Sequence, residues 1–113
     1  MKLIRDRIPQ MMAANGQRCA HRIATPVEYR AWLNAKLIEE AAEVIGATVP
    51  GPTATIAALA RELADVLEVV HAIAATNGIS PTMLECERQY RRDDRGGFTR
   101  GVIWHGPDGA PKE

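Results

Sequence analysis

Apolar and polar positions follow helical spacing along most of this chain, and proline and glycine separate the periodic stretches. Thr25-Pro26-Val27-Glu28 has the sequence of a capping box with proline at the first helical position. The pattern predicts four helices, over about 9–15, 26–47, 54–76 and 81–95. The segments 18–24 and 98–104 are candidates for two short strands that pair with each other. The sequence therefore predicts an all-α fold, a helical bundle of about four helices with room for short terminal strands.

The periodic pattern also suggests where the domain ends. We predict that residues 1–104 form a single domain and that the glycine- and proline-rich residues 105–113 form a flexible tail. A chain of 113 residues buries only about two thirds of its unfolded surface when it folds alone. A dimer that extends the core is therefore expected.

Composition limits the partners. The 14 Lys and Arg residues balance the 14 Asp and Glu residues, and the basic positions within 88–100 are interleaved with acids. This balance disfavours nucleic acid and membrane partners. Charged residues at 5–7 interrupt any signal peptide, no uncharged apolar stretch reaches 18 residues, and Cys19 and Cys86 are interpreted as free thiols. We expect a soluble, cytoplasmic protein.

Two acidic motifs carry the candidate chemistry: Glu39-Glu40-Ala-Ala-Glu43 and Glu62-Leu-Ala-Asp65. At about 100° per residue, the carboxylates of each motif fall on one side of a helix. Two such helices facing each other would gather five negative charges, which repel unless cations lie between them. All-oxygen ligands favour Mg²⁺, with Mn²⁺ as a second candidate.

The first acidic helix has two different faces. Its core stripe is expected to contain Leu33, Leu37, Ile38, Ala41, Val44 and Ile45. The opposite stripe runs from Tyr29 and Trp32 through Lys36 to the acids, an order that suits a nucleotide base followed by its phosphates. The alternative is that Lys36 pairs with Glu39 and Glu40 on a solvated face while Trp32 packs in the core.

The second acidic helix is apolar on nearly every side, as expected for a buried central helix. A buried, unpaired carboxylate is unstable, so Glu62 and Asp65 require a cation, a partner or a wet cleft. Alternatively, Arg61, Asp65, Glu68 and His71 form a polar surface strip. His71 lies about 180° from Glu62 and is interpreted as a surface or core histidine.

The acidic pattern E-E-x-x-E followed by E-x-x-D resembles that of the all-α nucleoside triphosphate pyrophosphohydrolases. This superfamily includes MazG, dimeric dUTPases and phosphoribosyl-ATP pyrophosphohydrolase. The terminal blocks, Lys2 to Pro9 and Arg95-Gly96-Gly97-Phe98, resemble those of its phosphoribosyl-ATP-pyrophosphohydrolase-like branch of predicted house-cleaning enzymes. The resemblance covers residues 2–104 and implies a helical bundle that assembles into homodimers or homotetramers. The Gly- and Pro-bearing break at 46–53 departs from the family pattern.

The resemblance also implies roles for individual residues. The divalent-metal ligands would be Glu39, Glu40, Glu43, Glu62 and Asp65. The catalytic residues would be Glu39, Glu40 and Lys36, with one of the glutamates as the base. The nucleotide would contact Arg5, Asp6, Trp32, Lys36 and Arg95.

The expected activity is Mg²⁺-dependent hydrolysis of a non-standard nucleoside triphosphate to its monophosphate and pyrophosphate. Two alternatives stay open. One is phosphoribosyl-ATP hydrolysis in histidine biosynthesis, and the other is a non-catalytic helical dimerisation module whose acids are merely solvated.

Overall fold

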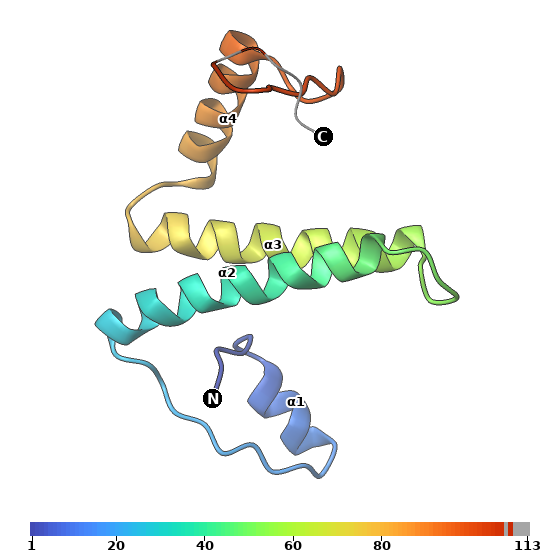
Figure 1. The fold of residues 1–113 in the computed structure, drawn as a ribbon. Helices are drawn as coiled ribbons and strands as arrows, with labels where there is room; N and C mark the ends of the chain where they lie inside the picture. Colours follow the sequence, from blue (N-terminus) through green and yellow to red (C-terminus); the bar gives the residue numbers. More distant parts are fainter. Residues whose placement is uncertain (108, 110–113) are drawn as a thin grey trace. The chain divides into compact units, whose positions relative to one another are not determined.

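The computed structural model describes residues 1–107 and 109, and it contains four helices in this part of the chain (Figure 1). They are α1 (Ile8–Ala14), α2 (Pro26–Thr48), α3 (Ile56–Thr76) and α4 (Pro81–Arg95). The predicted all-α fold is confirmed, and the helix bounds lie within two residues of the predicted ones. Gly16 and Gly78 follow α1 and α3 with positive φ angles of 74° and 71°, which glycine adopts without strain.

The two predicted strands are wrong. No strand is present within residues 1–107, and 18–24 is instead an irregular lead into α2. The backbone turns back at the start of 98–104, where the Gly101 amide donates a hydrogen bond to the Phe98 carbonyl. A segment that turns at Gly101 cannot supply the extended backbone that strand pairing needs. Of the predicted tail, 105–113, residues 108 and 110–113 lie outside the described residues.

Side-chain caps begin both long helices. The Thr25 hydroxyl accepts a hydrogen bond from the Glu28 amide at 3.3 Å, and Glu28 accepts one from the Thr25 amide at 2.8 Å, which completes the predicted capping box. Arg22 also donates to Glu28, and this bond, with the Thr25 amide, lowers the pKa of Glu28 to about 2. Thr55 caps α3 in the same way through the amide of Ala58.

The helices α2 and α3 form an antiparallel pair joined by the loop 49–55 (Figure 1). Their contact surface buries Leu33, Val69 and Ala74, the buried hydrophobic residues of the described chain. At the other end of the pair, Arg30 donates hydrogen bonds to the Asn77 side chain and the Thr76 carbonyl, just after α3. These bonds satisfy groups at the end of a helix, so they fix the register of the pair.

The prediction that α3 is a buried central helix is wrong for the single chain, and so is part of the predicted α2 core stripe. Five large aliphatic side chains remain 48–89% exposed: Ile38, Ile45, Ile56, Leu63 and Leu67. The reason is geometric. Each helix has an apolar stripe wider than one neighbouring helix can cover, so the α2–α3 contact leaves one flank of each helix exposed.

The chain forms two compact units, Met1–Pro81 and Thr82–Glu113. The first contains α1, α2 and α3, and therefore both acidic motifs. The second contains nearly all of α4, and Tyr90, Phe98 and Trp104 are exposed there. The predicted division at residue 104 stays a prediction. None of the described helices is both long and apolar enough to span a membrane.

Candidate metal centre

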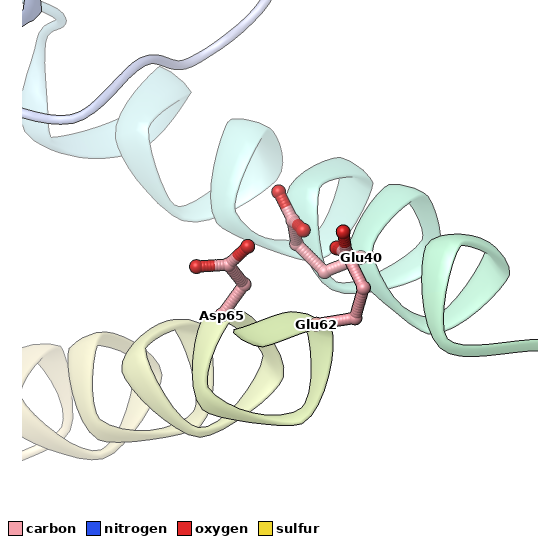
Figure 2. Close-up of side chains that lie close together, drawn as sticks. All are labelled: Glu40, Glu62 and Asp65. Atoms are coloured by element: carbon pink, nitrogen blue, oxygen red, sulfur yellow. The ribbon is translucent and has the colours of Figure 1, made fainter. Parts of the chain in front are cut away.

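Three carboxylates from the two acidic helices meet at one place. Glu40 on α2 and Glu62 and Asp65 on α3 each offer an oxygen within 4.8 Å of the others, as Figure 2 shows. The three-residue spacing places Glu62 and Asp65 on one side of α3, and the antiparallel pairing brings Glu40 beside them. All three residues are partly buried. The two motifs are thus joined by the fold into one carboxylate group, hereafter the triad.

The donor chemistry of the triad fits a hard divalent cation. Ligand oxygens lie about 2.0–2.1 Å from Mg²⁺, so in an octahedral shell neighbouring ligands are roughly 3 Å apart and opposite ligands roughly 4 Å apart. The carboxylate oxygens of the triad lie within 4.8 Å of one another, so small movements of the side chains would let one ion contact all three. Three charged oxygen donors would leave the remaining ligand positions to water or phosphate oxygens.

Lys36 lies against the triad. Its Nζ atom is 3.3 Å from an oxygen of Glu39 and 3.3 Å from one of Glu40. The pairing expected in the alternative interpretation is present, and the side chains of Lys36 and Glu40 are mostly buried, at 15% and 13% exposed, while Glu39 is 36% exposed. Partial desolvation opposes ionisation of Glu39, yet the hydrogen bond and charge of Lys36, aided by Lys2, lower the pKa of Glu39 overall.

The N-terminal segment supplies two more cations. Lys2 Nζ lies 3.5 Å from Glu39 Oε1, and Arg5 Nη2 lies 2.7 Å from Asp65 Oδ1. One contact is to α2 and the other to α3, so the segment crosses the face that carries the acids. We call Glu39, Glu40, Glu62 and Asp65 the acid face. The structure thus places Arg5 beside Asp65 of the triad, and its role in substrate binding, implied by the family resemblance, stays a prediction.

Lys2 is the residue at this site that the sequence analysis missed as a contact. It lies in a segment without regular secondary structure, where no helical period indicates which side chains point the same way. Its signal in the sequence is its position three residues before Arg5 in the same N-terminal block.

The other predicted site residues lie in different surroundings. Glu43 is exposed on α2 and, like Glu39, is not part of the triad, while Trp32 is half-buried on the same helix. Asp6 is exposed beside Arg5. Arg95 ends α4 in the second unit, where its Nε lies 3.9 Å from a carboxylate oxygen of the neighbouring acid. Their roles stay predictions.

Comparison with known proteins gives one family. Residues 8–92 match the family described as phosphoribosyl-ATP pyrophosphohydrolase. The matched stretch contains the whole triad and Lys36, and it starts after Lys2 and Arg5. No curated protein and no solved structure matches the chain.

Proposed function

Because the chain belongs to the phosphoribosyl-ATP pyrophosphohydrolase family, we propose that it hydrolyses a nucleoside triphosphate, non-standard in its base or sugar, to the monophosphate and pyrophosphate. Family membership indicates a pyrophosphohydrolase; the substrate and a house-cleaning role are our proposal. The observation that carries it is the triad, in which two helices contribute carboxylates that repel one another without a cation.

Mg²⁺ is the proposed cofactor, with Mn²⁺ able to replace it. Glu40, Glu62 and Asp65 would hold the ion, and Glu39 and Glu43 are the additional ligands that the sequence predicts. A bound divalent ion would neutralise phosphate charge and lower the pKa of a coordinated water.

The chain's own residues would do the rest. Lys36, held between two glutamates, would donate to phosphate oxygens and stabilise the charge that develops on the transferring group. Glu39 or Glu40 would accept the proton of the attacking water. Arg5 and Arg95 would contact phosphates, and Asp6 and Trp32 would contact the nucleoside; the half-buried Trp32 ring suits stacking on a base.

The second candidate substrate is phosphoribosyl-ATP, which is equally consistent with the description of the matched family. Both candidate substrates carry a triphosphate attached to a nucleoside, so a metal held by the triad could bind the phosphates of either one. Only the substrate panel separates them.

The proposed function is tested by measuring pyrophosphate release from standard and modified nucleoside triphosphates and from phosphoribosyl-ATP. Mg²⁺, Mn²⁺ and EDTA are compared in parallel. Metal-dependent release of pyrophosphate and monophosphate from any member supports the enzyme and names its substrate class. If no member of the panel releases pyrophosphate and metal does not stabilise the protein, the result would favour the non-catalytic dimerisation module.

We also propose that the partner of this chain is a second copy, giving a homodimer or homotetramer. The support is the set Ile38, Ile45, Ile56, Leu63 and Leu67, hereafter the apolar flank. The three on α3 lie roughly 160–200° around the helix from Asp65, so they turn away from the acid face. Large aliphatic side chains exposed in this number on two paired helices often mark an interface.

A second copy suits this flank better than other partners because the described chain buries so few hydrophobic residues of its own. Pairing of two α2–α3 layers would bury ten large aliphatic side chains in one four-helix core. The charge balance and two free cysteines, Cys19 and Cys86, support an enzyme that acts on a small molecule in the cytoplasm, without nucleic acid or membrane partners.

A further inference from the structure

Glu39 holds two ammonium groups, one on each of its carboxylate oxygens. Lys2 Nζ lies 3.5 Å from Oε1, and Lys36 Nζ lies 3.3 Å from Oε2. The two lysines differ in access: the Lys36 side chain is 15% exposed and the Lys2 side chain is 65% exposed. Glu39 therefore contacts two ammonium groups: that of Lys36, which is mostly buried, and that of Lys2, which faces solvent.

The contact between Lys2 and Glu39 is a weak source of stability. It joins two partly exposed side chains at a distance longer than a good hydrogen bond, and such pairs contribute little to folding. What the contact does provide is position, because it keeps an exposed ammonium group beside Glu39 on the acid face. The same N-terminal segment is anchored again three residues later, by the shorter bond from Arg5 to Asp65.

The net charge of the site would change sign if a divalent metal bound there. The four carboxylates of the acid face are opposed by three cationic side chains, Lys2, Arg5 and Lys36. One divalent cation would give this group a net positive charge, which suits a polyphosphate anion. A metal on Asp65 would also compete with Arg5 for that carboxylate, so the cations of the N-terminal segment would then gain from a new anionic partner.

We infer that Lys2 is a phosphate-binding residue, held ready by Glu39, and that the N-terminal segment forms the solvent-side wall of the polyphosphate site. This inference rests on the proposed function. On substrate binding, the Lys2 ammonium moves from Glu39 to a non-bridging phosphate oxygen, while Lys36 contacts the polyphosphate from the half-buried side. No bond is made or broken in this step.

The test is calorimetric binding of inorganic tripolyphosphate in the presence of Mn²⁺, with any purification tag at the C-terminus so that Lys2 keeps its surroundings. Tripolyphosphate lacks a nucleoside, so it reports on the phosphate contacts alone. We compare the parent protein with Lys2→Met, which removes the charge, and Lys2→Arg, which keeps it. Arg88→Met is the matched control, because it removes one positive charge from an exposed ion pair with Glu85 on α4.

Lys2→Met should weaken tripolyphosphate binding about tenfold, as expected for loss of a charge-assisted hydrogen bond. Lys2→Arg should stay within about twofold of the parent, and Arg88→Met should leave binding unchanged. The affinity for Mn²⁺ alone, measured separately, should be unchanged or slightly higher in Lys2→Met, since a cation has been removed.

Three results would overturn the inference. If the parent binds tripolyphosphate and Lys2→Met binds within twofold of it, Lys2 makes no phosphate contact and the proposed function is unaffected. An equal loss of Mn²⁺ affinity in Lys2→Met would show that Lys2 supports the triad structurally. If the parent protein binds neither Mn²⁺ nor tripolyphosphate, both this inference and the proposed function fail.

Discussion

The acid face and the apolar flank of the α2–α3 pair differ in how far one chain completes them. On the acid face, Lys36 and the N-terminal segment already bring cations to the carboxylates. On the apolar flank, the aliphatic side chains remain 48–89% exposed. The comparison indicates that charge compensation at the site is built within one chain, whereas much of the hydrophobic burial requires a partner. Chemistry and assembly should therefore respond to different mutations.

The largest expected effect is on the acid face. Glu62→Gln or Asp65→Asn should lower turnover more than about a hundredfold, because loss of a metal ligand costs more than loss of its outer partners. Stability without metal should hold or rise as repulsion is relieved, and stabilisation by Mg²⁺ should be lost. Activity and thermal unfolding with and without Mg²⁺ measure this.

The control for this test is Glu85→Gln, which removes an exposed carboxylate paired with Arg88 on α4. It should leave turnover unchanged. Full turnover in both triad variants would contradict the metal-centre assignment. It would also contradict the proposal that the acid face, and not the apolar flank, carries the chemistry.

The next effect is on the apolar flank. Leu67→Glu should reduce the particle mass to that of one chain and lower the unfolding temperature, because a charge at a buried interface costs several kcal/mol. Light scattering after gel filtration gives the mass. Ile23→Glu is the matched control, since Ile23 is exposed in the lead to α2 and lies outside both surfaces.

The result also identifies what covers the flank. A parent protein that is monomeric and yet loses stability on Leu67→Glu would show that another part of the same chain packs there, against our proposal. A monomeric variant that still binds Mn²⁺ would confirm that the acid face is complete in one chain.

A smaller effect separates two adjacent carboxylates. Glu40→Gln should weaken Mn²⁺ binding about tenfold or more, because Glu40 belongs to the triad. Glu39→Gln should weaken it less than about threefold, since both oxygens of Glu39 contact lysines. Mn²⁺ titration by electron paramagnetic resonance measures both. Equal losses of Mn²⁺ affinity in the two variants would instead indicate that Glu39 binds the metal as directly as Glu40 does.

These residues show which parts of the molecule were predictable. Most helix ends were accessible from the sequence because Thr25 and the glycines after α1 and α3 act locally, but the Thr55 cap was missed and α3 begins two residues after its predicted start. The meeting of Glu40 with Glu62 and Asp65 was accessible too, because both motifs have helical spacing and the short loop 49–55 makes the helices antiparallel.

The rest depends on contacts that periodicity does not report. An apolar stripe shows that Ile38 and Leu67 need cover, but it does not show whether the same chain supplies it. Lys2 lies outside any helix, and its contact with Glu39 joins residues far apart in the sequence. The apolar residues of 98–104 suggested a strand. The turn that ends at Gly101 prevents one, and the apolar pattern gives no sign of that turn.

The smallest effect lies at the α2 cap, whose residues belong to neither surface, and it tests whether the cap is independent of both. The Arg22 hydrogen bond and the Thr25 amide lower the pKa of Glu28 to about 2, below its unfolded value of about 4.3. A depressed pKa gives stability that is present above the unfolded pKa and lost as the pH falls toward 2. Glu28→Gln should thus destabilise the protein modestly at pH 7, and its difference from the parent should shrink between pH 4.5 and pH 2. Urea unfolding across this range, with Arg22→Met as a second variant showing the same convergence, measures it.

A constant difference would mean that Glu28 acts only through its cap geometry, and any accompanying change in Mn²⁺ affinity or particle mass would show that the cap is coupled to the acid face or the apolar flank.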